Sequence, residues 1–253
     1  MKKILFVLFA ISSFQNYAQS NPFFKRTPLE GGLTLSSNGC MSAVGLDIHQ
    51  YWGLGKKQRK MNIGLGIRLT SSFGSSNLNY ITAPANLTSG KTGPGVFFSD
   101  QVVENIDTVF LNNTQVNAFN LFLALHYKAY KKWAVEFNID LIGASFGGNK
   151  TATINYGDGI YGTKTTTAKP TSPNVLLISD NDKGSLNSEF MISYQLKDNI
   201  KLKAGPVFLF NEYTVENPVS YTNTKSTLIN TDRYRKKAFM FGIGFNYVFN
   251  KKN

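Results

Sequence analysis

Large apolar residues alternate with small or polar residues along most of this chain, most clearly near the C-terminus. From Phe239 to Phe249 every odd position is aromatic or isoleucine, while Gly242, Gly244 and Asn246 stand between them. A period of two places these two sets on opposite faces of a β-strand. The pattern therefore predicts a strand with one large apolar face and one face of smaller groups.

The same alternation recurs in seven further segments: 30–37, 43–53, 61–73, 117–129, 133–146, 185–196 and 200–212. Eight strands can close a narrow barrel whose interior is filled by side chains. We therefore predict an all-β fold, an eight-stranded antiparallel transmembrane β-barrel in up-and-down order. It forms one domain over residues 21–253.

The connections between these strands fall into two classes that alternate along the chain. The short ones are 55–60, 130–132 and 197–199, and the long ones, rich in Gly, Ser, Thr and Asn, are 74–115, 147–184 and 215–235. Short periplasmic turns and long extracellular loops are typical of outer-membrane barrels. Asn38-Gly39 forms a tight-turn pair after the first strand. Within the loops, 77–83 and 106–111 are candidates to extend a hairpin above the membrane.

A soluble, lipocalin-like barrel is the structural alternative, because its strands also alternate but with the apolar side chains inside. A water-facing polar face should be dense in Lys and Glu, whereas this one is dominated by Gly, Asn, Ser and Ala. Trp52, Trp133, Tyr247 and Phe249 also lie near the short turns, where an interfacial aromatic girdle is expected. Both features favour the membrane barrel.

The first twenty residues read as a secretory signal peptide. Lys2 and Lys3 precede an apolar run over 4–11, and Ala18 and Ser20 fit a small-x-small cleavage pattern. A short apolar N-terminal strand is the alternative. No later segment has the roughly 18 consecutive apolar residues of a membrane helix. We expect export to the outer membrane of a Gram-negative bacterium.

The chain is basic, with 27 Lys and Arg against 15 Asp and Glu. Removing Lys2 and Lys3 leaves 25 against 15, a net charge of +10. Export argues against nucleic acid, and lysines in the short turns can face anionic head groups instead. Cys40 is the only cysteine, which excludes an intramolecular disulfide and a cysteine-based metal site. We expect no metal or cofactor.

Several charged residues are predicted to point into the barrel. With the turn centred between 57 and 58, Asp47 and Arg68 fall opposite each other, and around Lys131 Glu136 falls opposite His126. The other candidates for this interior network are His49, Asp140, Glu189, Lys201 and Lys203. Inward charges are costly unless paired, so the network is interpreted as a plug held by an Asp47–Arg68 pair. A polar path for small solutes or protons is the alternative.

Enzymatic and binding roles rest on few residues. His49 and His126 are the only histidines, and neither stands in a Ser-His-acid arrangement. We therefore expect no catalysis. A lipid-modifying barrel enzyme is the less favoured alternative. The loops carry aromatic residues, namely Tyr80, Phe97, Phe98, Tyr156 and Tyr161. Aromatics beside glycines suit a partner protein or a glycan. They can equally cap the barrel or pack on one another.

Three segments carry a resemblance to a known family: Tyr17-Ala18-Gln19, Val44-Gly45-Leu46-Asp47, and the final run from Gly242 to Phe249. The chain resembles small outer-membrane β-barrels of Bacteroidota-type bacteria, including PorT-like proteins, and more distantly OmpA/OmpX-type barrels. It departs from them in that 250–253 follow the last aromatic residue. The resemblance implies a fold and a location. We expect a structural or accessory barrel with a closed polar lumen, whose partners are outer-membrane lipids and other outer-membrane or secretion-machinery proteins. A small pore is the alternative function.

Overall fold

The computed structural model describes residues 24–54, 60–76, 78–157, 162–177, 181–223 and 225–249; the expected signal peptide lies outside them. Within these ranges thirteen strands join in one sheet, which confirms the all-β prediction. Helical structure in these ranges is limited to α2 (Ala85–Thr88) and the 3-10 turns η1 (Gly93–Phe98) and η2 (Val103–Asn105). None of the described helices is long and apolar enough to cross a membrane.

Eight long strands pair in a closed antiparallel ring, which we name the main ring. They are β1 (Phe24–Ser37), β2 (Met41–Leu54), β3 (Met61–Gly74), β6 (Gln115–Tyr130), β7 (Trp133–Phe146), β11 (Leu186–Lys197), β12 (Ile200–Thr222) and β13 (Leu228–Val248). Each pairs with the next, and β13 pairs back onto β1. The eight alternating segments of the sequence correspond to these strands.

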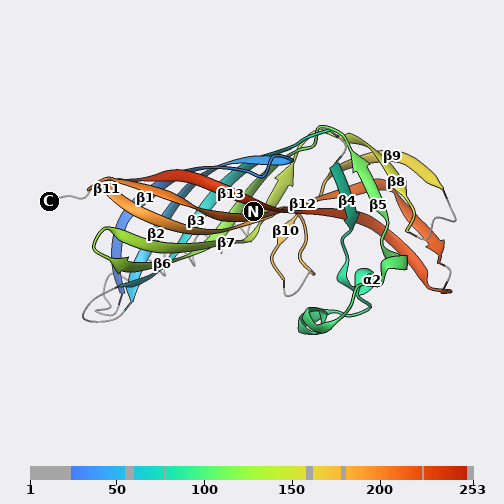
Figure 1. Ribbon diagram of the computed structural model, residues 1–253, viewed down its shortest axis with the longest axis horizontal. Coiled ribbons are helices and arrows are strands. Elements are labelled where there is room, and N and C mark those ends of the chain that lie inside the picture. Colours follow the sequence, from blue (N-terminus) through green and yellow to red (C-terminus); the bar gives the residue numbers. More distant parts are fainter. Residues whose placement is uncertain are drawn as a thin grey trace, which may run out of the picture.

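The expectation of only eight strands joined by long loops is wrong. The expected loops contain β4 (Leu78–Thr82), β5 (Thr108–Leu111), β8 (Lys150–Asn155), β9 (Thr163–Pro170) and β10 (Asn174–Val175). The first four of these pair in the order β4–β5–β8–β9 and attach to β13 and β12, whose distal halves extend beyond the main ring. These six strands form a second closed ring, the upper ring. Figure 1 shows β12 and β13 running through both parts of the molecule.

The outer face of the main ring is apolar. Leu46, Ile48, Phe239 and Phe241 have between 47% and 69% of their surface exposed, whereas alternate positions on the same strands are buried. The polar positions that the sequence alternation marks lie inside. This arrangement is the reverse of a lipocalin-like barrel, and the soluble alternative therefore fails for the main ring.

The polarity of β12 inverts where it passes from the main ring to the upper ring. In the main ring the buried face carries Lys203 and the exposed face carries Leu202. In the upper ring the buried face carries Val215 and Tyr221, and the exposed face carries Glu216. One strand thus presents an apolar outer surface along one half and a polar outer surface along the other.

The predicted aromatic girdle is present only in part. Trp133, Tyr247 and Phe249 are between 41% and 49% exposed, but Trp52 is only 9% exposed. The strand β1 begins at Phe24, six residues before the expected start, and places Arg26 opposite Trp52. Trp52 consequently lies beside a paired neighbour strand rather than at an open strand end.

Candidate functional site

A continuous chain of charged side chains occupies the interior of the main ring. It begins where Nζ of Lys201 lies 2.5 Å from Oε1 of Glu30. The other Glu30 oxygen is 3.6 Å from Nε2 of His49, whose Nδ1 is 2.6 Å from Oδ1 of Asp47. Strands β12, β1 and β2 supply these groups because their inward positions alternate with the apolar outer ones.

The chain of ion pairs continues from β12 across the interior to residues of β11, β3 and β7. Nζ of Lys203 is 3.7 Å from Asp47 and 4.0 Å from Glu189. The Arg68 guanidinium then lies 3.3 Å from Glu189 and 3.2 Å from Asp140. Each of these five side chains exposes at most 4% of its surface. The charges are therefore compensated by one another across the interior rather than by water.

The predicted ion pair between Asp47 and Arg68 is wrong, although the predicted register is right. The two residues are directly opposite on β2 and β3. Arg68 nevertheless pairs with Asp140 and Glu189, and Asp47 pairs with His49 and Lys203. A long guanidinium side chain reaches across a narrow barrel, so that the cross-strand neighbour is not its closest carboxylate.

The predicted neighbours His126 and Glu136 face each other across β6 and β7. Nδ1 of His126 lies 2.9 Å from the Asn62 amide nitrogen, whereas Glu136 is fully buried and neither carboxylate oxygen has a hydrogen-bond partner among the described residues. Both histidines therefore point into the interior. Within the described ranges no cluster of three or more His, Cys, Asp and Glu side chains is suited to a metal ion.

Two groups of this interior network escaped sequence reasoning. Glu30 is 3% exposed and joins Lys201 to His49, but the expected strand only began at its position. The alternation could have identified it, because Glu30 lies an even number of residues from Thr34 and Ser36 and therefore shares their inward face of β1. The buried amide of Asn120 donates to Asp140 and accepts from Asn174. Asn174 lies on β10, which no alternation marks.

The upper ring has an apolar core that continues into the main ring. Tyr80, Ile154 and Ile229 are fully buried within it, and the same cluster extends to Val207 and Met240 on the main-ring parts of β12 and β13. Burial raises the pKa of Tyr80 to about 12, so this phenol stays neutral at physiological pH. The interior is thus filled with charges in one part and with apolar groups toward the upper ring.

The loop aromatics are distributed differently from the sequence expectation. Tyr80 is a core residue, packed on Tyr213 with ring centroids 5.4 Å apart, which agrees with the packing alternative and not with the partner-binding one. Tyr156 packs on Tyr221 at 5.1 Å. Phe98 is 88% exposed on η1. Tyr161 and the side chain of Phe97 lie outside the described residues.

A buried group of arginine–carboxylate ion pairs lies where the two rings meet. Glu212 on β12 is fully buried and accepts two hydrogen bonds from Arg233, at 2.6 and 3.1 Å, and two from Arg235, at 3.2 Å from Nε and 2.8 Å from Nη2. Both arginines also donate to the carbonyl oxygen of Asp182. The segment after β10 is thereby held against the outer face of the sheet.

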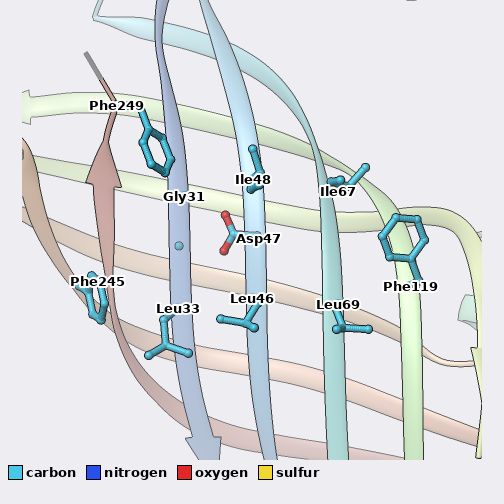
Figure 2. A pocket seen from close by; sticks show the side chains of 11 residues that line it. Gly31, Leu33, Leu46, Asp47, Ile48, Ile67, Leu69, Phe119, Phe245 and Phe249 are labelled. Atoms are coloured by element: carbon cyan, nitrogen blue, oxygen red, sulfur yellow. The ribbon is translucent and has the colours of Figure 1, made fainter. Parts of the chain in front are cut away.

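A shallow apolar groove of about 490 Å³ lies on the outer face of β1, β2, β3 and β6. Figure 2 shows Leu33, Leu46, Ile67, Phe119 and Phe245 around it. Gly31 contributes no side chain beside the Phe249 ring on this face, which leaves the hollow open. A groove with this lining suits a hydrocarbon chain.

No protein-family model and no curated protein sequence matches this chain. The solved structures that this chain matches include Neisserial surface protein A, at 8% identity and a TM-score of 0.29 over 90% of this chain and 98% of that one. The attachment invasion locus protein Ail of Yersinia pestis is 8% identical, with a TM-score of 0.31 over 88% of this chain and 98% of that one. The outer membrane protease OmpT of Escherichia coli is 8% identical, with a TM-score of 0.27 over 89% of this chain and 95% of that one. None of these comparisons confirms the resemblance to PorT-like proteins.

Proposed function

We propose that the main ring is an eight-stranded barrel that spans a bacterial outer membrane with a closed lumen, and that the upper ring is a rigid binding platform outside the cell. The inversion of polarity along β12 carries this proposal. A strand that is apolar outward in one half and polar outward in the other suits a passage from lipid to water. The lumen is closed by the ion-pair chain and the apolar cluster above it.

Membrane energetics support this assignment. A charged side chain on the lipid face of such a barrel costs about 2–4 kcal/mol at the bilayer midplane. The outward positions of the main ring avoid that cost because they carry residues such as Leu46, Ile67 and Ile243. The upper ring instead buries its apolar side chains against one another, as a water-exposed domain must.

The orientation follows from the positions of the strand ends. The upper ring and the β1–β2 turn lie at one end of the main ring, and the ends of β1 at Phe24 and β13 at Val248 lie at the other. Chain termini of outer-membrane barrels with an even strand number lie on the periplasmic side, together with the short turns. The upper ring accordingly faces the exterior.

The single exposed cysteine tests location and orientation together. Cys40 is exposed in the turn between β1 and β2. A membrane-impermeant maleimide should label it in intact cells, and Cys40→Ser serves as the unlabelled control. Labelling only after permeabilisation would reverse the orientation, and fractionation with soluble proteins would overturn the membrane assignment.

A further inference from the structure

The outer face of the upper ring is polar but nearly uncharged across three adjacent strands. The registers place Phe110 of β5 opposite Thr153 of β8, and Thr153 opposite Thr165 of β9. The other outward positions of β8 and β9, including Thr151 and Thr167, also carry hydroxyl or amide groups, except Lys169 near the end of β9. Charged residues make up about a quarter of average protein composition, so this face is unusual for a water-exposed surface.

A groove of about 590 Å³ lies on this face. Its lining combines one aromatic ring with amides, hydroxyls and one lysine: Phe110, Asn112, Lys150, Thr151, Thr153 and Asn155, with Asn149 at one end. Oδ1 of Asn155 is buried and accepts no hydrogen bond from the described residues. The volume falls in the range of small-ligand sites, roughly 300–1,000 Å³.

A second hollow of about 460 Å³ meets the first at Asn149. It is lined by Lys169 and Lys183, and the exposed Phe146 at the end of β7 links it to the membrane-facing surface. Asp232 and Arg233 also line it, and Arg233 is paired with Glu212. Lys169 and Lys183 form no ion pair with any described residue, so their charges are available to an anion.

We propose that the two hollows form one binding site for a phosphorylated saccharide, with the phosphate at Lys169 and Lys183 and the sugar over Phe110. This inference rests on the proposed role of the upper ring as a binding platform. The phosphate end lies next to the main ring, where the phosphorylated head group of an outer-leaflet glycolipid would lie. A free phosphorylated saccharide offers the same chemistry.

The residue types match this ligand. Asn side chains both donate and accept hydrogen bonds, as do Thr hydroxyls, and sugar hydroxyls require both kinds of partner. The flat ring of Phe110 offers an apolar surface for the C–H face of a sugar. Lysine ammonium groups bind phosphate through charge-assisted hydrogen bonds.

Binding measurements on the purified full chain in detergent test the proposal. The probes are intact lipopolysaccharide, the same material after phosphatase treatment, and its delipidated phosphorylated oligosaccharide. Phe110→Ala should weaken binding of intact lipopolysaccharide about tenfold or more. The double variant K169A/K183A should weaken binding of the phosphorylated probes by a similar factor and leave the dephosphorylated probe unchanged.

Lys91→Ala, at an exposed lysine outside both hollows, is the matched control and should bind like the wild type. Comparable binding of intact lipopolysaccharide and free oligosaccharide would assign the saccharide as the ligand, and a clear preference for lipopolysaccharide would assign the glycolipid. Failure of every probe to bind, or unchanged binding by both site variants, would overturn the saccharide site. The membrane platform would still stand if Cys40 were labelled in intact cells.

Discussion

Arg68 faces Asp47 across β2 and β3, yet its guanidinium pairs with Asp140, 3.2 Å away on β7. The register of a hairpin therefore identifies inward neighbours but not the ion pairs of a narrow interior. This distinction changes which carboxylates depend on Arg68.

Replacing Arg68 by leucine should destabilise the main ring by about 3–5 kcal/mol, because it leaves Asp140 buried without its cation and Glu189 with Lys203 alone. Urea unfolding in detergent measures the loss. A double-mutant cycle should give a larger coupling energy between Arg68 and Asp140 than between Arg68 and Asp47, with Asn as the replacement for each aspartate. Equal couplings would contradict the observed pairing.

An arginine on the outer face should be tolerated in only one of the two rings. Leu46→Arg places a charge on the apolar face of the main ring and should cost about 2–4 kcal/mol. Thr165→Arg makes the corresponding outward change on the exposed face of β9 and should cost little. Folding yield and unfolding in lipid vesicles compare the two, and equal effects would show that the main ring does not face lipid.

The upper ring should depend on its aromatic core rather than on its exposed aromatics. Tyr80→Ala removes a fully buried ring and should cost roughly 3–5 kcal/mol. Phe98→Ala changes a residue that is 88% exposed and should leave stability unchanged. Limited proteolysis should cleave the upper ring of the first variant much faster. Wild-type resistance in Tyr80→Ala would show that the ring is not held by this core.

The purified protein should form no stable channels in planar bilayers. Arg68, Asp140, Glu189 and Lys203 are paired across the interior, and the apolar cluster fills the upper ring and extends from it into the main ring. Single-channel recording measures this directly, with a known porin as the positive control. Discrete, reproducible conductance steps would favour the small-pore function instead.

The upper ring illustrates where sequence periodicity stops. Strands β4 and β5 have only five and four residues, too few to show a convincing period of two. The Thr-rich strand β9 resembles a polar loop in sequence. Its residues are polar on both faces almost throughout, so the buried Ala168 alone does not make an apolar–polar alternation visible. The segments 77–83 and 106–111 nevertheless stood out as candidates for hairpin extension and correspond to β4 and β5.

The main ring and its register follow from local information, since a strand's faces are set by alternation and a hairpin's register by its turn. Alternation marked the outward face of Leu46, and the turn placed Asp47 opposite Arg68. Closure of the upper ring, the burial of Tyr80 and the pairing of Arg68 with Asp140 were decided only by the tertiary structure. These features join residues far apart in the chain, and their partners depend on how the strands curve and how far side chains reach across the enclosed space.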